Sequence, residues 1–177
     1  MVMNNKVLKW IIVVCSLFAL FGFWFMFGGK TFNTERKTLS DITVMPEANG
    51  STEEITERIV IEQQFISSLN SIEKVAIVFN RLYQPEKEAF IAIELSDDQG
   101  VIGYKRINVS EIESQHRTFV DVKSTQNLKD KELVLRIYSD SEVDTGMALM
   151  MKYEEGLSFK FGNMTINGTL CFNVVGE

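Results

Sequence analysis

The residue types that catalyse hydrolysis or bind metal ions are sparse in this sequence. Its single histidine is His116, in the polar stretch SQHR, and its two cysteines are Cys15 and Cys171. A Ser-His-Asp triad or a Cys-His pair would have to use His116, and a zinc site needs three or four good ligands. Cys171 lies in an apolar run, where a thiol usually packs as a small hydrophobic group. We therefore expect no catalytic site, no enzyme activity and no cofactor.

One run of carboxylates is a candidate metal site. Asp140, Glu142 and Asp144 alternate in the stretch SDSEVDTG, and a loop with this spacing can turn several oxygens towards a hard cation such as calcium. The twelve-residue EF-hand pattern is not completed, because the closing position, residue 151, is methionine. A structural calcium site and a solvated acidic turn are both compatible with this stretch.

Four tyrosines are candidate ligand-binding residues. Sugar-binding sites use exposed aromatic rings that stack on the faces of the sugar, beside a few polar side chains. Each tyrosine could equally pack half-buried on a strand, so the sequence leaves both roles open. The four residues are Tyr83, Tyr104, Tyr138 and Tyr153.

The net charge of the chain excludes some classes of partner. Residues 31–177 contain 15 basic and 24 acidic side chains, which gives a net charge of −9. An acidic surface repels phosphate backbones and anionic lipid headgroups. We expect no nucleic-acid partner and no peripheral attachment to anionic lipid.

An apolar segment close to the N-terminus predicts a membrane anchor. Residues 10–29 are uncharged, and as a helix they would span about 30 Å, the thickness of a bilayer's hydrocarbon core. The segment is longer than the apolar core of a secretion signal, and it ends in bulky rings where a cleavage site needs small residues. We expect an uncleaved, single-pass anchor in the cell membrane after a short tail, residues 1–9. Basic residues flank both ends, so the positive charges do not decide the orientation. A short N-terminal tail, one span and a β-rich domain are most commonly arranged with the domain outside the cell, which favours an extracytoplasmic C-terminal domain.

The rest of the chain predicts a linker followed by β-strands. Residues 30–54 mix Thr, Ser, Asn, Glu and Gly, which is typical of a stalk, with an early strand at 41–45 as an option. Residues 55–177 alternate apolar and polar positions, the period of a half-buried strand. A hairpin turn is expected at SDDQG, where Gly100 supplies a positive φ. The nine predicted strands are 58–66, 73–80, 90–95, 100–107, 117–124, 131–139, 146–153, 157–161 and 169–175.

This succession of short strands predicts an all-β domain. No long helical period separates the strands, whereas a parallel α/β sheet would need crossover helices. We expect an antiparallel β-sandwich of the jelly-roll kind, with about eight or nine strands, preceded by one N-terminal transmembrane helix.

Several stretches resemble a known family. The segments IVIEQQFIS, IEKVAIVFN, LVLRIYSDS and MTINGTLCFNVVGE are similar to successive parts of galactose-binding-like jelly-roll domains in bacterial cell-envelope membrane proteins of surface-polysaccharide pathways. The resemblance covers about residues 55–176. It implies that Gln63, Gln64 and Phe65 belong to the strand that opens the sandwich, and that an Asn-Gly turn at 167–168 leads into the last strand.

The resemblance also implies a role in the cell envelope. It suggests carbohydrate binding, or assembly with a membrane protein that builds an envelope glycan, and the single predicted span suggests an accessory domain with its own anchor. We expect a non-catalytic, extracytoplasmic binding module. One alternative is a structural or regulatory subunit that contacts other proteins through an exposed strand edge. Another is an envelope glycan hydrolase with two facing acids.

Overall fold

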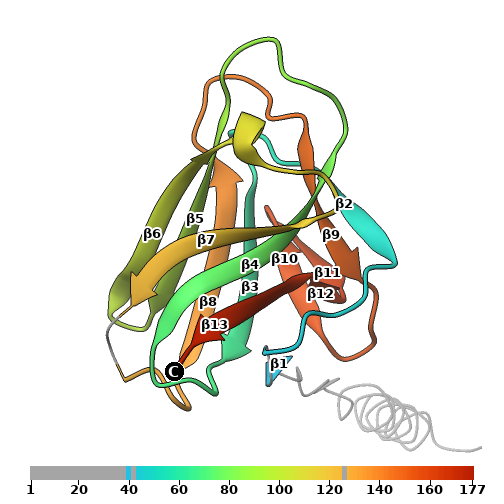
Figure 1. Ribbon diagram of the computed structural model, residues 1–177. Helices are drawn as coiled ribbons and strands as arrows, with labels where there is room; N and C mark the ends of the chain where they lie inside the picture. Colours follow the sequence, from blue (N-terminus) through green and yellow to red (C-terminus); the bar gives the residue numbers. More distant parts are fainter. Residues whose placement is uncertain (1–38, 41–42, 125–126) are drawn as a thin grey trace, which may run out of the picture. The chain divides into compact units, whose positions relative to one another are not determined.

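The computed structural model in Figure 1 describes residues 39–40, 43–124 and 127–177. The predicted tail and anchor, residues 1–9 and 10–29, lie outside the described residues. Within the part of the chain that is described, no helix is long and apolar enough to cross a bilayer.

The described chain is an all-β sandwich of two sheets. The strands of the first sheet are β1 (Leu39–Ser40), β3 (Val60–Ile66), β5 (Phe90–Asp97), β6 (Gly100–Asn108), β8 (Glu132–Ser139), β10 (Ser158–Phe161) and β11 (Met164–Asn167). Those of the second sheet are β2 (Gly50–Glu54), β4 (Ile72–Arg81), β7 (Arg117–Ser124), β9 (Met147–Lys152), β12 (Thr169–Leu170) and β13 (Phe172–Gly176). One turn of 3-10 helix, Val109–Glu111, follows β6.

Both sheets are antiparallel apart from one short pairing. The first has the order β11-β10-β3-β8-β5-β6, and β1 pairs with β3 in the parallel direction. The second has the order β12-β9-β4-β13, with β2 beside β9 and β7 beside β4. Figure 1 shows β4, β7 and β13 crossing in front of β3, β5, β6 and β8, which is the arrangement of a two-layer sandwich.

The predicted strands are confirmed, except that 169–175 is divided at Cys171 into β12 and β13, and the structure adds three strands that the alternation did not indicate, β1, β2 and β11. Gly50–Glu54, inside the predicted linker, forms β2; its sequence GSTEE is polar, and it is an edge strand that pairs with β9. Met164–Asn167 forms β11 in a hairpin with β10. The early strand considered at 41–45 is not supported, since residues 43–45 form no strand and residues 41–42 lie outside the described part.

The core lies between the sheets and is built from the inward positions of the alternating strands. Phe65 of β3 and Phe172 of β13 meet edge to face across the sandwich, with ring centroids 5.6 Å apart. Both side chains are buried, as are the isoleucines and leucines at alternate positions of β5 and β8. Each such side chain contributes about 1.5 to 3 kcal/mol through removal of apolar surface from water, so the alternation read from the sequence accounts for the two layers.

A buried glutamine connects the two sheets. Gln63 of β3 is 1% exposed. Its Nε2 donates to the carbonyl oxygen of Ser158 at 3.3 Å, and its Oε1 accepts from the backbone nitrogen of Leu170 in β12 at 3.2 Å. Of the two neighbouring glutamines in β3, only Gln63 points inward and makes these hydrogen bonds, while Gln64 is exposed.

Between β11 and β12 the chain passes from the first sheet to the second through a single glycine. Gly168 is the residue between β11 and β12, has φ of +134°, and donates its N–H to the carbonyl oxygen of Leu157 at 2.9 Å. A Cβ at this position would lie 2.3 Å from the carbonyl oxygen of Lys152. The predicted Asn-Gly turn is therefore confirmed as a corner at which only glycine fits.

The predicted hairpin at SDDQG is also confirmed. Asp97 ends β5 and its Oδ1 accepts from the backbone nitrogens of Gln99 at 2.9 Å and Gly100 at 3.2 Å, while Gly100 has φ of +137°. These backbone bonds, together with Lys131 at 3.4 Å, hold the pKa of Asp97 below its ordinary value.

Candidate functional site

The outer face of the first sheet aligns charged residues from adjacent strands. In the register of β3, β8 and β5, Glu62 lies opposite Arg136, and Arg136 lies opposite Glu94. Arg136 Nε lies 2.8 Å from a carboxylate oxygen of Glu62, and Nη1 lies 2.9 Å from one of Glu94. Lys160 of β10 reaches the second oxygen of Glu62 at 3.1 Å. This ion-pair row fixes long polar side chains in one geometry.

The electrostatics of the row follow from these contacts. The hydrogen bond from Arg136 lowers the pKa of Glu62, and Lys160 lowers it further, while partial burial opposes both. The same bonds to Glu62 and Glu94 raise the pKa of Arg136. The arginine therefore stays charged between the two carboxylates and bridges them, which offsets their mutual repulsion.

Two of the candidate tyrosines lie on the same face, beside this row. Tyr104 of β6 stands opposite Glu94 and is 49% exposed. Tyr138 of β8 stands opposite Ala92 and is half-buried. Burial raises the pKa of Tyr138, and the charges of Glu94 and Tyr104 raise it further. Ala92 lies between Tyr138 and Arg106 in the register and is fully buried although it faces outward.

Arg106 completes this surface, which we call the tyrosine face. Its guanidinium lies 3.6 Å from the ring centroid of Phe90 and its Nε lies 2.8 Å from a carboxylate oxygen of Asp140. Stacking and pairing together restrict the arginine to one position. The tyrosine face consists of Glu94, Tyr104, Arg106, Arg136 and Tyr138.

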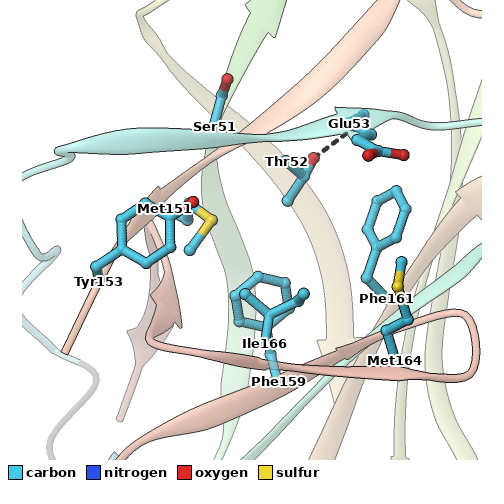
Figure 2. Close-up of a pocket in the computed structure, with 9 residues that line it drawn as sticks. All are labelled: Ser51, Thr52, Glu53, Met151, Tyr153, Phe159, Phe161, Met164 and Ile166. Atoms are coloured by element: carbon cyan, nitrogen blue, oxygen red, sulfur yellow. Dashed lines mark hydrogen bonds between the residues drawn. The ribbon is translucent and has the colours of Figure 1, made fainter. Parts of the chain in front are cut away.

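The other two candidate tyrosines lie elsewhere. The hydroxyl of Tyr83 donates to Glu54 Oε1 at 2.6 Å, and the same oxygen accepts from the backbone nitrogen of Gly146 at 2.7 Å. This hydrogen bond raises the pKa of Tyr83 to about 12, and its partners indicate a structural role. Tyr153 lies instead at one end of a groove between β2 and the β10–β11 hairpin, as Figure 2 shows.

The three acids considered for calcium are not gathered into one cluster among the residues that the structure describes. Among the described residues no group of three or more His, Cys, Asp or Glu side chains is placed to hold a metal ion. Asp140 pairs with Arg106 instead, which leaves Glu142 and Asp144 without a third carboxylate.

The single histidine and the described cysteine have surroundings that fit the sequence analysis. His116 is exposed in a loop, where its Nδ1 lies 3.0 Å from the carbonyl oxygen of Ser114. Cys171 is buried, and burial raises the pKa of its thiol to about 11. A reactive thiol needs a lowered pKa, so the buried Cys171 thiol stays protonated near neutral pH.

The sequence indicated the tyrosines but missed their polar neighbours. Arg136 and Tyr138 are two positions apart on one strand, so the alternation does place both on the outward face. The approach of Glu94, Tyr104 and Arg106 depends on how the strands pair, which no pattern in the sequence states. A comparison with known protein families and with curated proteins finds no match to this chain.

The lowered pKa of Glu62 predicts a loss of stability in acid. A carboxylate with a lower pKa in the folded than in the unfolded chain stabilises the fold fully above the unfolded pKa, and this contribution disappears as the pH falls through the folded pKa. We expect Glu62→Gln to reduce, by about 1 kcal/mol or less, the rise in the free energy of unfolding between about pH 3 and 5. Urea unfolding followed by circular dichroism at several pH values measures this.

The matched control for this variant is Gln64→Ala. Gln64 is the next outward residue of β3, is exposed and does not ionise, so its replacement should keep the pH dependence of the wild type. An unchanged pH dependence in Glu62→Gln would contradict the assignment of Glu62 to the ion-pair row.

Proposed function

We propose that the sandwich is a non-catalytic carbohydrate-binding module, and that the tyrosine face is its binding surface. The observation that carries the proposal is the position of Tyr104 and Tyr138 together on one outer face, beside arginines and a carboxylate already held by other contacts. Aromatic rings supply stacking surfaces for a sugar, and charged side chains supply strong hydrogen bonds to its hydroxyl groups.

The held side chains favour binding for an entropic reason. A flexible side chain that becomes fixed on binding costs about 0.5 to 1.5 kcal/mol. Arg136 is already fixed by Glu62 and Glu94, and Arg106 by Asp140 and the ring of Phe90. A sugar would therefore meet donors and acceptors that lose little further freedom.

The proposal extends to where the module works. The resemblance to jelly-roll domains of envelope proteins supports a role in surface-polysaccharide assembly, and the apolar segment 10–29 supports an anchor in the cell membrane with the sandwich on the extracytoplasmic side. Under this proposal the partner is an envelope glycan, or a membrane protein that assembles it, and the sandwich has the jelly-roll topology.

Replacing the two tyrosines is expected to abolish most sugar binding. On an array of bacterial surface glycans, the full-length protein should bind a limited set of sugars, and Tyr104→Ala and Tyr138→Ala should each weaken that binding about tenfold, which corresponds to about 1.4 kcal/mol. Tyr153→Ala is the matched control, because Tyr153 is also exposed, at 58%, but lies outside the tyrosine face. An array without binding, or an equal loss in the control, would overturn the proposal.

A further inference from the structure

An apolar groove opens between the two sheets on the side of β2 and β11. Figure 2 shows Phe159 and Ile166 at its centre, Met151 and Tyr153 at one end, and Phe161 and Met164 at the other. The cavity has a volume of about 150 Å³, and a cavity of about that size holds one benzene ring. The groove therefore accepts one bulky apolar side chain.

The groove has a buried floor and an exposed rim. Phe159 and Phe161 are buried, whereas Met164 is 54% and Tyr153 is 58% exposed. Large apolar side chains at the rim of an apolar cavity are typical of a surface that another molecule covers. The thioether of methionine suits such a surface, since it adapts to different shapes.

Each side of the groove is bounded by the end strand of one sheet. Within the described residues, β11 pairs with β10 alone and β2 pairs with β9 alone. The pairing of β11 with β10 is regular over its four residues, while β2 has a register shift between Ser51 and Glu54. A bulge makes an edge unsuitable for further pairing, so β11 is the edge that can accept another strand.

The side chains of β11 alternate so that an added strand would face the groove. Met164 and Ile166 line the groove, and Thr165, between them, pairs across to Lys160 on the outer face. A strand beside β11 would follow the same period of two. Every second residue of the added strand would then point at the cavity.

The charge of the rim selects the sequence of the occupant. Glu53 is the one charged residue among the nine that line the groove, it is exposed, and no ion pair joins it to another of the described residues. In Figure 2 its carboxylate lies above Phe161. The surrounding chain is acidic, with a net charge of −9 over residues 31–177, so the complementary ligand is basic.

We propose that the groove binds an extended segment of a partner protein, which pairs with β11, inserts one aromatic or large aliphatic side chain between the sheets and places a lysine or arginine against Glu53. This mode of recognition combines backbone hydrogen bonds, which give affinity, with a pocket and a charge, which give specificity. It uses none of the residues of the tyrosine face, so it stands independently of sugar binding.

A selection from a library of random seven-residue peptides on the full-length protein tests this proposal. We expect enrichment of peptides with an aromatic or large aliphatic residue and, close to it, lysine or arginine. Binding of one synthetic enriched peptide, measured by titration calorimetry, should weaken at least tenfold in Met164→Arg, which places a cation at the mouth. Glu53→Lys should weaken it similarly and should shift a repeated selection towards acidic peptides.

The matched control for the charge change is Glu132→Lys. Glu132 is also an exposed strand glutamate and lies on β8, outside the groove, so its replacement should leave peptide binding unchanged. Absence of enrichment, enrichment of acidic peptides by the wild type, or equal effects of Glu53→Lys and Glu132→Lys would overturn the proposal. Preferential binding of a detergent with a dodecyl chain, competing with the peptide, would also overturn it, since the occupant would then be an acyl chain.

Discussion

Replacing Gly168 with alanine is expected to destabilise the protein by about 3 kcal/mol or more. Its φ of +134° belongs to a region that residues with a Cβ rarely adopt, and the new Cβ would lie 2.3 Å from the carbonyl oxygen of Lys152. Neither the corner nor β9 can move away without breaking the pairing of β12 with β9. Urea unfolding followed by circular dichroism should show this loss, or no folded protein.

Gly100→Ala separates the two causes. Gly100 has nearly the same φ, +137°, but a Cβ there meets nothing within 4 Å. The control should lose only the conformational part, about 1 to 3 kcal/mol, and the difference between the two variants measures the contact with Lys152. If Gly168→Ala proved no worse than Gly100→Ala, the close approach of the corner to β9 would be wrong.

The sequence predicted most strands correctly, because a strand that is buried on one face has an apolar residue at every second position. Each strand of the core repeats apolar residues with a period of two, as Ile91, Ile93 and Leu95 do in β5. The strand β2 lacks this alternation. Its sequence, GSTEE, has few apolar side chains to bury, and the strand is stabilised by its pairing with β9. A strand that is held mainly by backbone hydrogen bonds cannot be predicted from the alternation of apolar residues.

The hairpin that carries β11 did have a signal. Gly162 and Asn163 form the two-residue connection between β10 and β11, and Gly162 has φ of +57°. A Gly-Asn pair between two short alternating runs favours a tight hairpin turn. Only the brevity of the four-residue strand concealed it, and with it one side of the apolar groove.

The two binding surfaces differ in how much of each the sequence contains. The tyrosine face uses residues that are separated by up to 44 positions, from Glu94 to Tyr138, and its assembly depends on the order β8-β5-β6. The groove depends on the free edges of both sheets meeting on one side, which is a property of the complete topology. Residue types indicate candidate binding residues, but the order of the strands determines which of these residues lie side by side.

Gln63→Leu is expected to cost about 2 kcal/mol, because it removes the hydrogen bond that joins the two sheets while changing the size of the side chain little. The backbone nitrogen of Leu170 would lose its acceptor in a buried position, and an unsatisfied buried donor costs about 1 to 3 kcal/mol. We expect lower stability in urea and faster hydrogen exchange at the amide of Leu170. Both effects come from one broken link between β3 and β12.

The outward neighbour in β3 provides the comparison for this variant. Gln64→Leu changes the same side-chain type on the same strand, but on the exposed face, and should alter stability by about 0.5 kcal/mol or less. A protein that tolerated both substitutions equally would show that Gln63 fills space without linking the sheets. A selective loss in Gln63→Leu, together with faster exchange at Leu170, would show that a polar residue in the core holds together the end of the sandwich on which the groove is built.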